Sequence, residues 1–162
     1  MGNIASAPQA DNKQKYENYK EQFGHLNLAL KHHFNLEAVF IAYAIMEDRT
    51  ESVLRHAGKY EAYIKSRKGH TPTIDSKIRY IQKLAEPKKE LLNKYFADEL
   101  LDQILEWKEN RNRLIHALLK QKITTADLEE MTYLGANLAN DLRNRVRNYN
   151  RVMERQNRKF ER

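Results

Sequence analysis

Apolar side chains recur every three or four positions along most of this chain, which is the spacing of one face of an α-helix. Capping residues and turn signals divide the pattern into segments. The pattern predicts helices over about 11–31, 36–57, 75–86, 99–121 and 124–155, with another turn or two over 89–95. No segment alternates apolar and polar residues as a half-buried strand does. We therefore expect an all-α fold, an antiparallel bundle of four to five helices.

The helix predicted over 36–57 shows how the ends are placed. Asn35 is of a type that caps helix N-termini, and Gly58 is the usual residue just past a helix C-terminus. The apolar face between them follows Leu36, Val39, Phe40, Tyr43, Met46, Val53 and Leu54. We expect this face to pack against the rest of the bundle.

The composition is that of one polar domain. The chain has 162 residues, of which 41% are hydrophobic and 31% charged, with five glycines, three prolines and no cysteine. A chain of this length buries a single core, and the lack of cysteine excludes disulfide scaffolds, thiolate metal sites and cysteine nucleophiles. We expect a flexible N-terminal arm over residues 1–10, one helical domain over 11–155 and a basic end over 156–162.

Other features of the composition narrow the range of possible partners and cofactors. The longest apolar stretch, residues 36–46, is too short to span a bilayer, so we expect a cytoplasmic protein without a membrane partner. The histidines lack metal-ligand spacings such as H-E-x-x-H, and no glycine-rich loop is present to bind phosphate. No metal or cofactor is therefore predicted. The formal net charge of +7 favours a polyanionic partner.

The helix predicted over 99–121 carries the most unusual pattern. Arg111 takes a position that the periodicity assigns to the core, where a guanidinium is unfavourable unless it is paired or faces a wet cleft. Asn112 and His116 lie one turn apart on the adjoining face, with Lys108 one turn earlier. The patch combines a permanent cation, an amide and an imidazole. A structural salt bridge is the alternative explanation. The buried face of this helix runs through Leu100, Ile104, Trp107, Arg111, Leu114 and Leu118.

The segment Arg111–His116 reads Arg-Asn-Arg-Leu-Ile-His and resembles the R-N-x-x-x-H signature of the HEPN superfamily, which also lies inside a helix of an all-α bundle. Arginine followed by histidine is a weak signal, but an asparagine directly after the arginine makes it far more specific. Arg49 and His56 match the looser spacing without that asparagine. The resemblance covers residues 35–155 coarsely, in helix order and in the motif.

HEPN proteins are typically metal-independent ribonucleases that dimerise so that two motifs form one cleft. The resemblance implies that Arg111 binds the scissile phosphate, that His116 moves the proton of the ribose 2′-OH or of the leaving oxygen, and that Asn112 orients them. Some members also use an acid of the preceding long helix. Glu47 points inward on its helix and is expected to pair with Arg111, with Asp48 as the second choice. RNA supplies its own nucleophile, so the protein needs only an acid–base group and a cation.

The C-terminal stretch concentrates the positive charge. Residues 143–162 hold eight basic and two acidic side chains, a net +6 of the total of +7. Spacings of four, four and three place four arginines in one stripe, here called the C-terminal stripe: Arg147, Arg151, Arg155 and Arg158. We expect the stripe and Lys108 to bind RNA, and Tyr149 to offer a stacking surface for an unpaired base. A solvated helix end, favoured by the helix dipole, is the alternative.

Three hypotheses follow for the function. The first is a metal-independent HEPN-type endoribonuclease, acting as a homodimer in a toxin or phage-defence setting with an antitoxin or regulatory partner. The second is a catalytically inactive HEPN module that binds RNA or nucleotide. The third is a helical interaction protein whose basic tail binds a partner or a membrane surface. The intact R-N-x-x-x-H motif favours the first.

Overall fold

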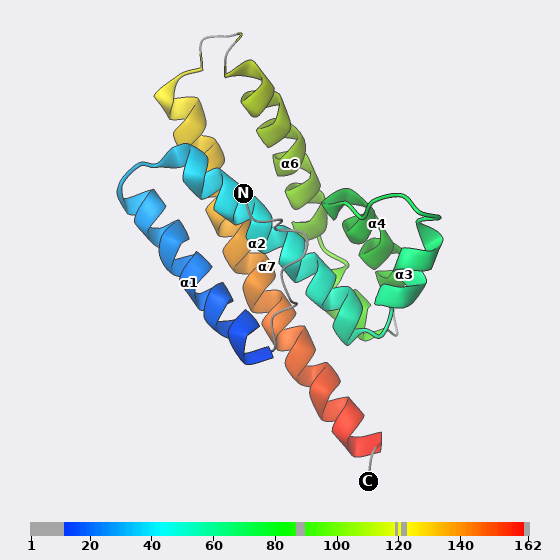
Figure 1. Ribbon diagram of the computed structural model, residues 1–162. Helices are drawn as coiled ribbons and strands as arrows, with labels where there is room; N and C mark the ends of the chain where they lie inside the picture. The colour runs from blue at the N-terminus through cyan, green and yellow to red at the C-terminus, as the bar shows by residue number, and fades with distance from the viewer. Residues whose placement is uncertain (1–11, 87–89, 119, 121–122, 161–162) are drawn as a thin grey trace.

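The computed structural model describes residues 12–86, 90–118, 120 and 123–160, and the regular structure in these ranges is entirely helical (Figure 1). The predicted all-α fold is confirmed for them. Their seven helices are α1 (Asn12–Lys31), α2 (Asn35–His56), α3 (Tyr60–Ser66), α4 (Ile74–Ala85), α5 (Leu91–Phe96), α6 (Leu100–Ala117) and α7 (Thr125–Phe160). The sequence predicted four to five helices. α3 was not predicted, and α5 corresponds to the turn or two over 89–95.

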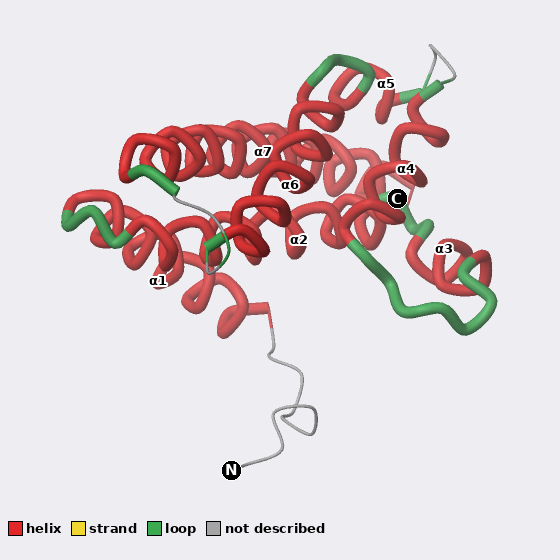
Figure 2. The backbone as a smooth tube through the Cα atoms, turned by 90° about the horizontal axis from the view of Figure 1, so that it is seen from above, coloured by secondary structure: helices red, strands yellow, loops and turns green. Residues whose placement is uncertain are grey.

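The helices form a bundle around α2 and α7 (Figure 1). α1 and α2 run antiparallel, as do α6 and α7, whereas α2 and α7 run in the same direction. α2 packs against α7 and α1, α6 packs against α7, and α4 packs against α2, α5 and α6. Figure 2 shows α3 on the side of α2 that faces away from α1. We call residues 60–85, which include α3 and α4, the α3–α4 lobe.

The core fixes α6 firmly against α7. The ring of Trp107 is almost completely buried, and its Nε1 donates a hydrogen bond to the carbonyl oxygen of Met131, 2.9 Å away. A Cβ atom on Gly135 would lie only 2.4 Å from Cζ2 of this ring. Glycine is therefore required for α6 and α7 to approach so closely. Arg111 follows Trp107 by one helical turn, so this contact also positions the motif.

Several helix ends differ from the predicted ones. Phe34, and not Asn35, stands at the N-cap of α2, without a side-chain capping bond, whereas Gly58 follows α2 with a φ of 64°, as predicted for a residue past a helix end. α6 ends at Ala117 instead of near residue 121, and α7 continues to Phe160 instead of ending near residue 155. The predicted arm over residues 1–10 lies outside the described residues.

The apolar face of α2 is buried only in part. Val39, Met46 and Leu54 are fully buried, but Leu36 and Phe40 are 38% and 50% exposed, so the prediction that they pack in the core is wrong. No helix in the described part of the chain has both the length and the apolar character needed to cross a membrane.

Candidate active site

Arg111 lies at the seam between α6 and α2. Its guanidinium carbon is 4.7 Å from the ring centre of Phe40 and 4.8 Å from that of Tyr43. Cations on aromatic faces gain about 0.5–2 kcal/mol per contact. Nη1 donates a hydrogen bond of 3.1 Å to Oδ1 of Asn112, while the buried Nε has no hydrogen-bond partner among the described residues. Arg111 is half-buried on the inward side of α6, as the periodicity predicted.

The guanidinium charge of Arg111 is not neutralised within the described part of the chain. Arg49, Arg55 and Arg145 each form an ion pair with a carboxylate, but Arg111 forms none. Buried cations are normally paired, although Arg143 of α7 is also half-buried, on the ring of Phe23, without an ion pair among the described residues. The arrangement suits a transient anion such as a phosphate.

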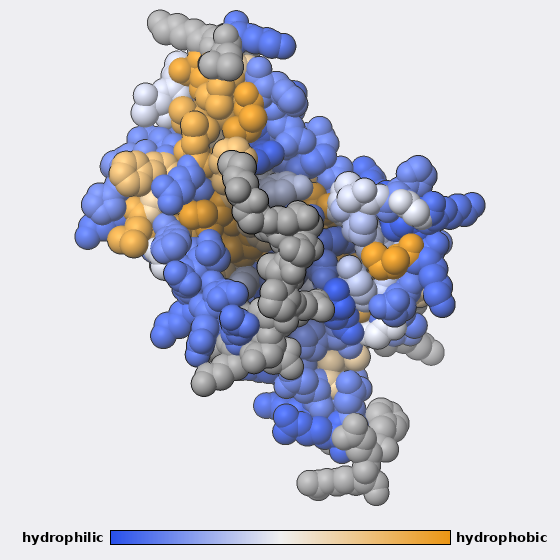
Figure 3. Space-filling view, in the orientation of Figure 1, coloured by the Kyte–Doolittle hydropathy of each residue, from blue (hydrophilic) through white to orange (hydrophobic). Residues whose placement is uncertain are grey.

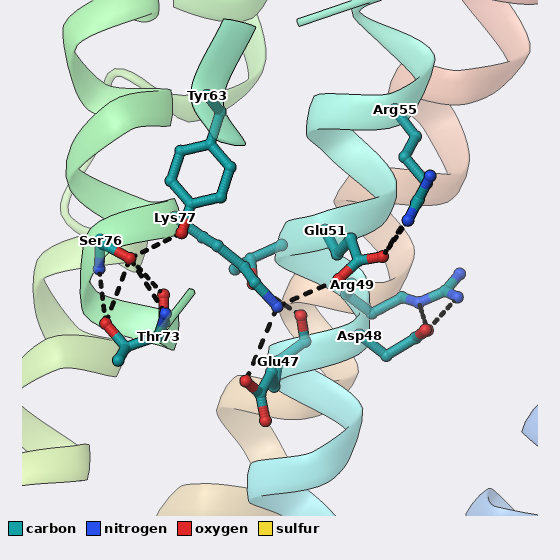
Figure 4. Close-up of polar contacts among 10 residues, drawn as sticks. Glu47, Asp48, Arg49, Glu51, Arg55, Tyr63, Thr73, Ser76 and Lys77 are labelled. Atoms are coloured by element: carbon teal, nitrogen blue, oxygen red, sulfur yellow. Dashed lines mark hydrogen bonds and ion pairs between the residues drawn. The ribbon is translucent and has the colours of Figure 1, made fainter. Parts of the chain in front are cut away.

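Glu47 does not form the expected ion pair with Arg111. Its Oε1 lies 3.6 Å from Nζ of Lys77, a buried lysine of α4 that also bonds to Oε2 of Glu51 at 3.2 Å (Figure 4). Nε of Arg55 in turn donates to Oε1 of Glu51 at 2.8 Å. Glu47 is therefore committed to the contact between α2 and α4.

Asp48, the second choice for an acidic helper, lies outside this network. Its carboxylate is exposed and pairs with the neighbouring Arg49, as Figure 4 shows. It makes no contact with the Arg111 site among the described residues. Neither Glu47 nor Asp48, the two predicted acidic helpers, therefore binds Arg111.

Tyr43 is a site residue that the sequence reasoning missed. It was assigned only to the apolar face of α2, yet its phenol lies within electrostatic range of Glu47, Arg111, Lys108 and Asp75. Burial, reinforced by the negative charge of Glu47, raises its pKa, so the phenol stays protonated and can donate a hydrogen bond. Its hydroxyl makes no hydrogen bond within the described part of the chain.

Lys108, predicted to bind RNA, is already paired. Its Nζ lies 2.9 Å from Oδ2 of Asp75 and 2.8 Å from Oε1 of Glu109. The hydrogen bond to Glu109 and the contact with Asp75 raise the pKa of Lys108. Through Asp75, this lysine connects α6 to the first turn of α4.

His116 lies in the last turn of α6 and is exposed. It forms no hydrogen bond or ion pair with the described residues, and none with Arg111. Among the described residues, no neighbouring group therefore orients the imidazole of the motif. A second copy or a ligand would have to complete the site.

The C-terminal stripe is exposed as predicted. Arg147, Arg151, Arg155 and Arg158 form no ion pair within the described residues, and the end of α7 is strongly hydrophilic in Figure 3. Tyr149, however, is not a stacking surface: it is 1% exposed and packs edge-on against Phe96, with ring centres 5.6 Å apart. Burial raises the pKa of Tyr149 to about 12.

An apolar surface adjoins the motif at the end of the bundle opposite the C-terminal stripe. Apolar side chains gather over this end in Figure 3. Exposed large side chains come from the end of α1, the start of α2 and the start of α7: Leu28, Phe34, Leu36, Phe40, Tyr133 and Leu134. Phe40 belongs both to this surface and to the Arg111 site. Contiguous apolar surface of this kind marks an interaction site.

Comparison with known proteins gives this chain no relative: no protein-family model, curated protein or solved structure matches it. Over residues 12–86, 90–118, 120 and 123–160, no group of three or more histidine, aspartate or glutamate side chains could hold a metal ion.

Proposed function

We propose that this protein is a HEPN-like endoribonuclease that cleaves RNA by attack of the ribose 2′-OH on the adjacent phosphorus. One observation carries the proposal: Arg111 is an unneutralised, half-buried cation, hydrogen-bonded to Asn112, five residues before the exposed His116. Arg111 would bind the scissile phosphate and stabilise the charge that grows on it. His116 would take the proton of the 2′-OH, and the histidine of a second copy would protonate the leaving 5′-oxygen.

Two features support a homodimer with a composite cleft. The apolar surface beside the motif exposes six large side chains, which a second copy would cover. One chain also supplies only one histidine in the R-N-x-x-x-H motif, whereas the reaction uses both an acid and a base. The ring centre of Tyr43 lies 4.8 Å from the guanidinium carbon of Arg111, and its protonated phenol would donate a hydrogen bond to a phosphate oxygen bound there.

A catalytically inactive module that binds RNA or nucleotide is the second candidate. It is favoured because no group in the described part of the chain orients His116. Such a module would bind RNA with Arg111 and the C-terminal stripe but leave it intact.

The decisive experiment is end-group analysis of RNA incubated with the protein, with and without EDTA. We expect cleavage of RNA but not DNA, persistence in EDTA, and 2′,3′-cyclic phosphate on the upstream fragment. Arg111→Gln should abolish cleavage, whereas Arg113→Gln, which removes an exposed arginine two residues later, should not. Intact RNA would favour the inactive module, and magnesium-dependent 5′-phosphate ends would refute the mechanism.

A further inference from the structure

A second group of unpaired cations lies in and just before the α3–α4 lobe. Residues 59–70 hold one acidic side chain, Glu61, and four basic ones: Lys59, Lys65, Arg67 and Lys68. The three lysines are exposed and form no ion pair within the described residues. By contrast, Arg55, Lys77 and Lys108, which lie close by in the fold, are each paired with carboxylates. The three lysines therefore present free positive charge.

These lysines stand on a fixed backbone. Tyr63 of α3 is almost fully buried, and its hydroxyl lies 2.6 Å from Oγ of Ser76 on α4, a contact visible in Figure 4. Beyond α3, Lys68 and Gly69 adopt φ values of 49° and 86°, which turn the chain back towards α4. The surface is therefore part of the fold and differs from a solvated tail.

The lobe leads directly to the Arg111 site. The loop that carries Lys68 ends at Thr73, the N-cap of α4, and Asp75 in the first turn of α4 binds Lys108 at 2.9 Å. Asn112 follows Lys108 by one turn of α6, which is about 6 Å along the helix axis. A strand bound at Arg111 can therefore continue over the loop and the lobe without leaving the surface.

The first part of α6 is acidic. It and the residues just before it expose a series of carboxylates: Asp98, Glu99, Asp102, Glu106 and Glu109. Asp98 is paired with Arg145, Glu109 is paired with Lys108, and Asp102 accepts a hydrogen bond of 2.7 Å from Gln82 of the lobe. Lys108 is the only basic residue in the segment 98–110, and it is already paired. Like charges repel a polyanion over several ångströms. A polyanion therefore meets favourable charge at the exposed lysines of residues 59–68 and not along this part of α6.

We propose that Lys59, Lys65 and Lys68 bind phosphates of a single RNA strand that extends from the Arg111 site over the α3–α4 lobe. The inference rests on the proposed function, since it takes Arg111 as the point where the strand is cut. Lysine ammonium groups contact phosphates as point charges and read no sequence. The lobe therefore supplies affinity and direction, and no base preference.

The test measures the affinity of a fully 2′-O-methylated, uncleavable RNA by fluorescence anisotropy over a range of salt concentrations. The double variant Lys65→Gln, Lys68→Asn removes two charges, and asparagine tolerates the positive φ at position 68. Each lost contact should lower the slope of log affinity against log salt by about 0.7, so that two contacts make binding about 25-fold weaker at about 0.1 M salt, with the difference vanishing near 1 M. The matched control, Lys20→Gln with Lys31→Gln, removes two exposed lysines of α1 across the bundle (Figure 1).

The outcomes separate docking from cleavage. An unchanged slope in the lobe variant, or an equal loss in the α1 control, would overturn the docking proposal even if the native protein cleaves RNA. A native protein that leaves cleavable RNA intact while the lobe variant still shows the expected loss would refute the nuclease and keep the docking surface. Binding to phosphatidylserine vesicles with no binding to RNA would assign the lobe to a membrane instead.

Discussion

Replacing Gly135 with alanine tests how tightly α6 is held against α7. The added Cβ would lie 2.4 Å from Cζ2, 2.7 Å from Cε2 and 2.9 Å from Nε1 of Trp107. Because carbon atoms pack best about 3.5–4.0 Å apart, the ring or the helix must move by about 1 Å. Trp107 is buried in the core, so the ring has no solvent into which to turn.

The expected change in the free energy of unfolding follows from these contacts. Overpacking of a core costs about 1–3 kcal/mol, and displacement of the ring also strains its hydrogen bond to Met131, worth about 1 kcal/mol. The better helix propensity of alanine returns about 1 kcal/mol. The net loss of about 1–3 kcal/mol in the free energy of unfolding should lower Tm by about 3–10 °C.

Gly24→Ala is the matched control, because a Cβ on Gly24 of α1 would have no atom within 4 Å. Alanine there should stabilise the protein by up to about 1 kcal/mol. Thermal and urea unfolding of the native protein and both variants, followed by circular dichroism, gives the comparison. If Gly135→Ala proved as stable as Gly24→Ala, the close approach of the two helices would be refuted.

Three further predictions concern the site and its surroundings. His116→Ala should abolish RNA cleavage with Tm nearly unchanged, because the side chain is exposed and unpartnered in the described part of the chain; a large fall in Tm with activity retained would indicate a structural role. Tyr43→Phe should lower kcat about 100-fold and leave KM unchanged, as the loss of one hydrogen bond to the transition state does. Equal kcat values for the native protein and the variant would exclude a role of the phenol in catalysis. Burial alone would raise the pKa of Glu51, but hydrogen bonds from Arg55 and Lys77 lower it on balance. Glu51 therefore stabilises the fold above its ordinary pKa of 4.5, and the stabilisation is lost as pH falls through the lower pKa of the folded state. Urea unfolding from about pH 6 to about pH 3 should thus show a steeper loss for the native protein than for Glu51→Gln.

The sequence predicted the helices well because their periodicity is local. The bounds of α1, α2 and α4 agree with the predicted ranges to within one or two residues. The burial of individual side chains was harder to predict, since it depends on which neighbour covers each turn. Phe40 lies at a position that helical spacing assigns to the apolar face of α2, yet no neighbouring helix buries it and it is 50% exposed. Tyr149, next to the C-terminal stripe in sequence, instead turns inward and packs on Phe96.

The site was predictable in its residue types but not in its pairing. The inward position of Arg111 followed from the seam of α6, and its neighbour Asn112 is the expected hydrogen-bond partner. The partner of Glu47 is Lys77 of α4, 30 positions later in the sequence. Ion pairs between distant segments are set by packing, which no local pattern encodes.

Under the proposed function, the length of α7 sets how long an RNA strand must be to contact all of the exposed positive charge. With 36 residues, α7 is twice as long as the 18-residue α6 that it supports. Arg155 follows Gly135 by 20 positions, so it stands about 30 Å along the helix from the level of Trp107. The spacing of about 3.4 Å per strand is that of a stacked, B-form helix, so a stacked strand needs about nine nucleotides to cover that distance and an extended strand needs fewer. If RNA binds as proposed, a shorter stacked oligonucleotide should reach the lobe from Arg111 but not the far end of the C-terminal stripe, and that end should add affinity only above this length.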